Sequence, residues 1–204
     1  MTSDAKAALE HFRGAVDAQV RHTLQTADLS ALTAASEMIK TSVAARGRLH
    51  VTGIGKPGHL AEYIASLITS TGTPAYFLHG TEAVHGSSGQ LVEGDVVIAI
   101  SNSGNTEELI STVRCAKSNG CRIIGVTGGS SSTLAMESDV VLLADIAEEG
   151  GPLNRAPRNS ILADMLILQM LSVMLQADAK VTPEQYVMHH PHGALGFLRE
   201  NERR

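Results

Sequence analysis

Residues 95–106 read DVVIAISNSGNT, an apolar run that passes directly into small polar residues and a glycine. The run 95–100 lacks alternation of apolar and polar residues, which is typical of a strand buried on both faces of a parallel sheet. Residues 101–106 are typical of the turn from such a strand into a helix, because serine, asparagine and threonine are favoured at helix N-termini. The stretch therefore predicts an α/β protein with helices on both faces of a parallel sheet.

The rest of the chain continues this alternation of strand and helix. Further strands are expected at 48–52, 75–78, 122–127 and 140–143. Helices are expected at 59–70, 106–119 and 160–176, with a short helix beginning at Pro183. Two antiparallel helices, 4–24 and 28–45, come first and form a hairpin that we expect to pack against another subunit. In such a sheet, ligands bind beyond the carboxyl ends of the strands, where the strand order switches.

The length and composition are those of one domain. We expect a single domain over 1–204, divided into a helical hairpin (1–46), an α/β core (47–180) and a C-terminal helix with a tail (181–204). The net charge of −5, without a basic stripe, argues against a nucleic-acid partner and against binding to a membrane surface. The two cysteines are six residues apart, match no zinc or redox motif, and are interpreted as reduced packing residues.

The N-terminal residues and the apolar stretches predict a location. The first ten residues contain two acids and a lysine and lack an apolar core, unlike a signal peptide. The longest apolar stretch, 165–175, is interrupted by Gln169 and Ser172 and is shorter than the ~18 residues that a membrane span needs. We therefore expect a cytoplasmic protein without a membrane partner.

The loop SNSGNT has the composition of an anion site. A helix N-terminus offers unpaired backbone N–H groups and a partial positive charge. The hydroxyls of Ser101, Ser103 and Thr106, beside the flexible Gly104, add donors with little bulk, which suits a phosphate. The same residues also make an ordinary polar helix cap, and composition alone leaves both interpretations open.

A second glycine-rich turn, GIGKPG, occupies residues 53–58. It lacks the third glycine of a dinucleotide-binding fingerprint, and its lysine is not followed by the serine or threonine of a Walker A loop. Lys56 is either a point cation for an oxyanion or a solvated lysine. Because a cation opposes the dipole at a helix start, its placement slightly favours a functional role.

Histidines and acids supply the remaining candidates. Five histidines lie at predicted loops or element ends: His79, His85, His189, His190 and His192. A lone histidine is more often structural, but five near predicted ligand loops favour a role for at least one. The HHPH run has no adjacent acid or cysteine, so we expect no metal and no cofactor. Glu107 and Glu108 serve either catalysis or dipole compensation, and Glu148 and Glu149 serve either catalysis or a solvated loop.

Five motifs occur in a characteristic order: GIGKPGHLA, STGTPAYFLHGTEAVHG, DVVIAISNSGNTEE, EEGGPLNRAP and HHPHGALG. From about residue 48 to 196, the chain resembles the arabinose-5-phosphate isomerase family of SIS-domain proteins. The resemblance implies a three-layer, flavodoxin-like sandwich with a five-stranded parallel sheet. It also implies a homotetramer with active sites where subunits meet. Members often continue into a pair of CBS domains, whereas this chain resembles the isomerase domain without that pair.

The resemblance also implies a reaction and a set of residues. The reaction is aldose–ketose isomerisation of a sugar phosphate, such as D-ribulose 5-phosphate and D-arabinose 5-phosphate, through an enediol. The catalytic residues implied are Lys56, His85, Glu108, Glu149 and His190. The residues implied for substrate and phosphate binding are Gly55, Ser101, Asn102, Ser103, Gly104, Thr106 and Arg158.

The chemistry suggests a role for each catalytic candidate. Glu149 is predicted to be the carbon base and His190 to open the sugar ring. Lys56 and His85 would polarise the carbonyl and hydroxyl oxygens, and Glu108 would orient one of them or share the base function.

Three positions depart from the family pattern: Pro57 where a serine is common, Ser87 where an aspartate is common, and Arg158 where a hydroxyl residue is common. These positions flank the expected ligand, whereas the catalytic types are kept. The sequence therefore leaves open an isomerase of another sugar phosphate and a non-catalytic sugar-phosphate sensor.

Overall fold

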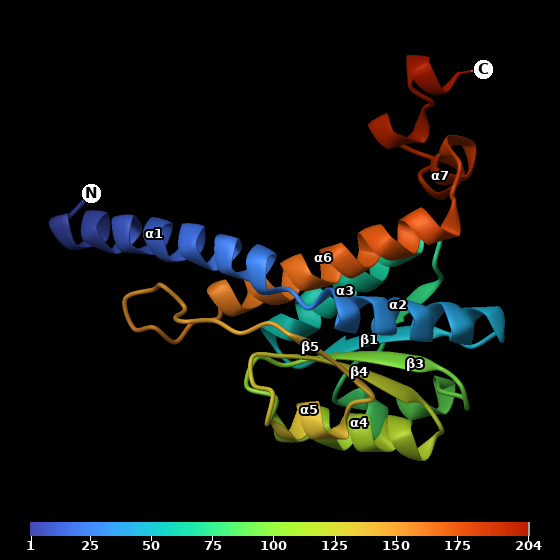
Figure 1. Cartoon of the computed structure of the whole chain (residues 1–204), viewed down its shortest axis with the longest axis horizontal. Coiled ribbons are helices and arrows are strands. Elements are labelled where there is room, and N and C mark those ends of the chain that lie inside the picture. Colours follow the sequence, from blue (N-terminus) through green and yellow to red (C-terminus); the bar gives the residue numbers. More distant parts are fainter. Residues whose placement is uncertain (204) are drawn as a thin grey trace.

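The computed structural model describes residues 1–203 as a three-layer α/β/α arrangement around one sheet (Figure 1). The five strands are β1 (Leu49–Gly53), β2 (Ala75–Phe77), β3 (Val96–Ile100), β4 (Arg122–Thr127) and β5 (Val140–Leu143). They are all parallel, in the order β2-β1-β3-β4-β5. The predicted fold class and the five predicted strands are thus confirmed, with bounds that differ by one residue at most.

The central strand β3 explains why the sheet is covered on both sides. All five of its residues are buried. Val96, Ile98 and Ile100 belong to the core cluster that includes residues of α2 (Leu29–Ala44), α3 (Lys56–Ser70) and α6 (Asn159–Ala179). Val97 and Ala99 belong to the cluster on the other face. An apolar residue at every position is therefore required, because alternate side chains enter different cores.

The second face is covered by shorter elements. These are α4 (Glu107–Ser118), α5 (Thr133–Glu137) and two 3₁₀ helices, η1 (Glu82–His85) and η2 (Ser87–Gln90). The sequence did not predict α5, η1 or η2. Helices this short are marginal on propensity alone and depend on tertiary contacts.

The first two helices are present, but the predicted hairpin is wrong. Helix α1 (Ser3–Thr26) and α2 follow one another end to end instead of folding back, and both pack on α6 rather than on each other (Figure 1). For α2 the reason is that α6 shares its apolar core, with buried Leu168 and Leu171 in the same cluster as Leu32 and Ile39. Helix α3 also differs from prediction, because it begins at Lys56 rather than near residue 59.

Helix α6 is longer and more apolar than the sequence analysis allowed. Its 21 residues pass a length-and-composition test for a membrane span, so the expectation that no such segment exists was wrong on that criterion. Core helices of globular proteins pass the same test, and α6 packs against α1, α2 and α3.

The C-terminal segment extends away from the sheet. It contains α7 (Pro183–His189), η3 (Ala194–Gly196) and η4 (Glu200–Glu202), at the opposite end of α6 from the β5–α6 loop (Figure 1). Exposed Met188 and Phe197 lie on this segment. An imidazole contact from His189 to the Ser70 carbonyl oxygen, at 3.3 Å, joins α7 to the end of α3.

Candidate functional site

Two loops leave neighbouring strands at the carboxyl edge of the sheet. Gly53 at the end of β1 pairs in register with Ile100 at the end of β3. The turn after β1 leads into α3 on one face, and the loop after β3 leads into α4 on the other. This is the switch in strand order at which ligands bind in open α/β sheets. The predicted GIGKPG and SNSGNT segments therefore follow neighbouring strand ends at this switch point.

Hydrogen bonds to its own hydroxyl groups stabilise the conformation of the SNSGNT loop. The hydroxyls of Ser101 and Thr106 are 3.2 Å apart, and the Gly104 N–H lies 3.2 Å from Ser101 Oγ. Gly104 has a φ of 61°, in the left-handed region, and a Cβ there would overlap the Ser132 side chain. Glycine is thus required at this point of the loop. Ser103 is exposed, whereas the Asn102 side-chain oxygen is buried against Gly128 and has no hydrogen-bond partner within residues 1–203.

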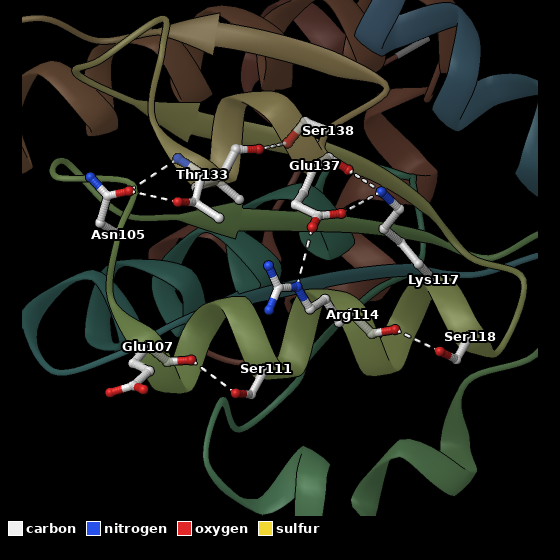
Figure 2. A network of polar contacts seen from close by, with 10 residues as sticks. Asn105, Glu107, Ser111, Arg114, Lys117, Ser118, Thr133, Glu137 and Ser138 are labelled. Atoms are coloured by element: carbon white, nitrogen blue, oxygen red, sulfur yellow. Dashed lines mark hydrogen bonds and ion pairs between the residues drawn. The ribbon is translucent and has the colours of Figure 1, made fainter.

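The loop is fixed from outside by α5, as Figure 2 shows. Asn105 Oδ1 accepts from the Thr133 N–H (3.0 Å) and from its hydroxyl (2.8 Å), and the Leu134 N–H donates to the Gly104 carbonyl (2.8 Å). At its other end, α5 is tied to α4 because Glu137 binds Lys117 and Arg114 (Figure 2). These hydrogen bonds, that of Lys117 first, lower the pKa of Glu137. The short unpredicted helix therefore braces the candidate anion loop.

The helix N-termini differ in whether a side chain caps them. Thr2, Asp28, Ser132 and Thr182 cap α1, α2, α5 and α7. Glu149 caps α6 from the preceding loop. Among the described α-helices, only α3 and α4 begin without a side-chain cap, at Gly55 and Thr106. Of the first three residues of α3, Lys56 alone can offer its N–H to a ligand, because Pro57 has no N–H and the Gly58 N–H donates to the Gly55 carbonyl oxygen at 3.0 Å. The first N–H groups of α4 are available at the switch point.

The turn after β1 brings backbone atoms unusually close together. A Cβ on Gly53 would lie 2.7 Å from the carbonyl atoms of Pro57. Gly55 has a φ of 65° and places Lys56 in the first turn of α3. Lys56 is exposed, and the contacts found among residues 1–203 give it no ion pair. A cavity of about 420 Å³ opens beside this turn, lined in part by Gly55, His59 and His79.

Glu149 is the most constrained of the predicted catalytic residues. Only 9% exposed, it accepts from the backbone N–H groups of Arg158 (2.6 Å) and Ser160 (3.1 Å) and from the Ser160 hydroxyl (2.6 Å). Its carboxylate thus caps α6, a stabilising place for an anion. The alternative of a solvated loop is wrong for this residue.

A second acid lies one helical turn further along α6. Asp164 is fully buried, and both of its carboxyl oxygens are without a hydrogen-bond partner among residues 1–203. Burial, and next the charge of Glu149, raise the pKa of Asp164 well above that of an ordinary aspartate. Sequence reasoning missed this residue. The available signal was one acid within the apolar run 161–175.

The other predicted residues are more exposed. Glu108 lies in the first turn of α4, beside the anion loop. His85 ends η1, which packs on α4, and is exposed. Arg158 precedes α6, and its guanidinium lies against Gly151, beside the loop that carries Glu149.

His190 is separated from the others within one chain. It follows α7, where it stacks on Tyr186 with ring centroids 4.2 Å apart. Helix α6 stands between it and Glu149, and 21 residues span roughly 30 Å at 1.5 Å per residue. One chain therefore brings Lys56, Glu108 and Glu149 to the carboxyl edge, but not His190.

The two glycine-rich loops at a switch point match a known domain. The SIS domain profile fits residues 42–174. The chain belongs to the SIS-domain family. The matched region of this SIS-domain protein contains the whole sheet and both loops at the switch point.

Relatives place this SIS-domain protein beside the arabinose 5-phosphate isomerases. The chain is 40% identical to arabinose 5-phosphate isomerase KdsD of Pseudomonas aeruginosa over 154 residues, which cover 76% of this chain and 47% of that one. It thus spans about half of that relative's length.

Solved structures share the arrangement. An E. coli CFT073 protein in complex with A5P has a TM-score of 0.82 and 31% identity, covering 94% of this chain and all of that one. A putative sugar-phosphate isomerase of Listeria monocytogenes has a TM-score of 0.86 and 27% identity, with the same coverage. The family resemblance inferred from the motifs is therefore confirmed.

Proposed function

We propose that this SIS-domain protein interconverts an aldose phosphate and a ketose phosphate, such as D-arabinose 5-phosphate and D-ribulose 5-phosphate. The observation that carries the proposal is the pair of α-helices without a side-chain cap, α3 and α4, which follow the paired strands β1 and β3 at the switch in strand order. The α4 N-terminus, the Lys56 N–H and the hydroxyls of Ser103 and Thr106 offer hydrogen-bond donors to a phosphate. Kinship with the arabinose 5-phosphate isomerases supports the choice of substrate class.

The proposed chemistry moves a proton between adjacent carbons. Glu149 takes the proton from the hydroxyl-bearing carbon beside the carbonyl, leaving an enediolate, and the former carbonyl oxygen gains a proton to give the enediol. The other hydroxyl then loses its proton to become the new carbonyl, while Glu149 returns the carbon-bound proton to the former carbonyl carbon. Lys56 and His85 stabilise the charge that develops on the oxygens, and Glu108 orients one of them. The three hydrogen bonds to the Glu149 carboxylate support this role, because they hold the base in one orientation.

Ring opening is assigned to His190 of another copy. The length of α6 keeps His190 of the same chain away from Glu149. We therefore propose a homotetramer with active sites at subunit interfaces, in which the exposed C-terminal segment reaches a neighbour. The proposed setting is the cytoplasm, where phosphorylated sugars are metabolised.

The test is turnover of a panel of aldose and ketose phosphates of four to seven carbons by the purified protein. At least one pair should interconvert, and Glu149→Gln should lower kcat by about 10²–10⁴-fold, the usual contribution of a general base. The Ser160 hydroxyl can reverse to accept from the new amide, so the fold should be kept.

The matched control uses two neighbouring acids. Glu108→Gln should reduce kcat, whereas Glu107→Gln, in the same helical turn, should leave it within about twofold of wild type. Full activity of Glu149→Gln removes it from the mechanism. Binding of a sugar phosphate without turnover would instead support the sensor function.

A further inference from the structure

Helix α1 holds the loop that carries Glu149 through two imidazole–carboxylate contacts. His11 Nε2 lies 2.8 Å from Glu148 Oε2, and His22 Nε2 lies 3.0 Å from Asp145 Oδ2. A carboxylate only accepts hydrogen bonds, so both imidazoles donate from Nε2. Between them, Gln19 Nε2 donates to the Asp145 carbonyl at 3.0 Å. The three α1 residues are 8 and 3 apart, which puts them on one face of the helix.

The helix and the loop also meet directly beside the candidate base. Gly150, next to Glu149, has a φ of 73°. A Cβ there would lie 3.0 Å from Ala15 Cβ and 3.2 Å from Phe12 Cδ2 of α1. Figure 1 shows α1 running alongside the start of α6, and the two helices are in contact. Glu149 is therefore set between a face of α1 and the N-terminus of α6.

The two histidine–carboxylate pairs contribute more to the position of the loop than to the stability of the protein. Both histidine pairs are well exposed, with side chains 57% and 37% accessible for His11 and Glu148, and 43% and 45% for His22 and Asp145. Exposed ion pairs contribute about 0–1 kcal/mol each to stability. Segment 144–158 contains no helix or strand. Such contacts therefore fix the conformation of the segment, while they add little to the free energy of unfolding.

We propose that His11 and His22 are positioning residues, which hold Asp145 and Glu148 so that Glu149 meets the sugar carbon in a reactive geometry. This inference rests on the proposed isomerase function. Neither histidine touches the substrate. Both affect turnover because they fix the position of the loop backbone. A misplacement of about 1 Å in a catalytic group can lower the rate by about 10²-fold.

The test compares two double variants. His11→Ala/His22→Ala should lower kcat by about 10- to 100-fold. Its KM should change less than its kcat, because the phosphate is proposed to dock mainly at the SNSGNT loop and the α4 N-terminus, outside this segment. His11→Gln/His22→Gln should restore most of the rate, since glutamine Nε2 supplies the same donor. The control Arg13→Ala/Arg21→Ala removes the pairs with Glu10 and Asp17, which stay within α1, and should leave kcat unchanged.

Hydrogen exchange of segment 144–158 gives a readout that needs no substrate. The segment should exchange faster in the double alanine variant than in wild type and in the arginine control. If no sugar phosphate is turned over by wild type, the proposed function fails, while this measurement still decides whether the histidines hold the loop. Unchanged exchange overturns the inference, as does a loss of kcat that glutamine does not restore.

Discussion

The two edges of the sheet differ in whether their charged groups have partners within the fold. At the amino edge, Asp95 is fully buried and accepts from the N–H groups of Arg48 (2.8 Å) and Val92 (3.0 Å) and from His50 (3.2 Å). The Arg48 guanidinium lies 3.3 Å from the same carboxylate. Burial lowers the pKa of His50, so its ring serves as a neutral donor near pH 7. Every oxygen of this acid is thus matched to a donor.

The carboxyl edge leaves several groups unmatched. Lys56, Arg155 and Arg158 have no ion pair among the interactions found in residues 1–203, and two helix N-termini are uncapped. The oxygens of Asp164, near Glu149, are buried and have no hydrogen-bond partner in the described part of the chain. A buried carboxylate whose oxygens all accept from groups of the fold stabilises that fold, whereas free cations and N–H groups at the other edge are available to an anionic ligand.

Breaking the amino-edge cluster should produce the largest effect. Asp95→Ala leaves two backbone N–H groups and a buried imidazole without their acceptor, so we expect the free energy of unfolding to fall by about 3–5 kcal/mol. Activity per folded molecule should persist, because the cluster is remote from the switch point. Urea denaturation beside an assay at low temperature measures both. Asp139→Ala, at the same edge but with 37% of its side chain exposed, is the control and should cost less.

Removing a free cation should have the opposite result, with activity lowered and stability kept. Lys56→Met should lower kcat/KM by about 10- to 100-fold, equivalent to about 1.4–2.8 kcal/mol of transition-state stabilisation. Its unfolding midpoint should stay unchanged, because Lys56 has no partner to lose. Lys40→Met, which removes a lysine bound to Glu37 and Asp178, should leave the rate unchanged. A rate for Lys56→Met equal to that of wild type would contradict a functional unpaired charge.

A smaller effect should follow from filling the anion loop. Gly104→Ala places a methyl group against Ser132 and 2.6 Å from Thr127 Oγ1, at a left-handed φ. We expect a loss of about 2 kcal/mol in stability together with weaker inhibition by inorganic phosphate. Gly129→Ala, whose Cβ would meet Ser132 Cβ at an ordinary 3.7 Å, should be nearly neutral. Equal phosphate inhibition in both variants would argue against this loop as the cradle.

The smallest effect is expected from Asp164→Asn, read through pH. The raised pKa of Asp164 means that the folded protein keeps a proton that the unfolded chain releases above about pH 4. This group therefore costs stability as pH rises above that value. The variant should gain stability relative to wild type as pH rises from about 4. If the difference in free energy of unfolding between variant and wild type is the same at every pH, Asp164 is not held neutral.

The same contrast explains which parts were predictable. The strands and the two glycine-rich loops follow from runs of a few residues, and all five strands were predicted within one residue. Helix α5 was missed because its five residues depend on residues from elsewhere in the chain. These are Asn105 and the ion-pair partners of Glu137. The hairpin was wrong because local pattern gives the length of a helix but not its direction.

The candidate site divides in the same way. Residue types at the loops predicted an anion cradle, a cation and an acid. They did not predict that Glu149 caps α6, that Asp164 is buried without a partner, or that residues 11 and 22 meet residues 148 and 145. His190 was expected at the site, but within one chain α6 separates it from Glu149.

Apolar runs, glycines and small hydroxyl residues act on their immediate neighbours along the chain, so the amino-acid order alone sets the buried strands and the donor-rich turns. Which acid faces which turn, and which helix supports it, depends on packing between segments more than a hundred residues apart. That packing is decided by shape and burial summed over whole layers, so it emerges only once the sheet and its helices are assembled.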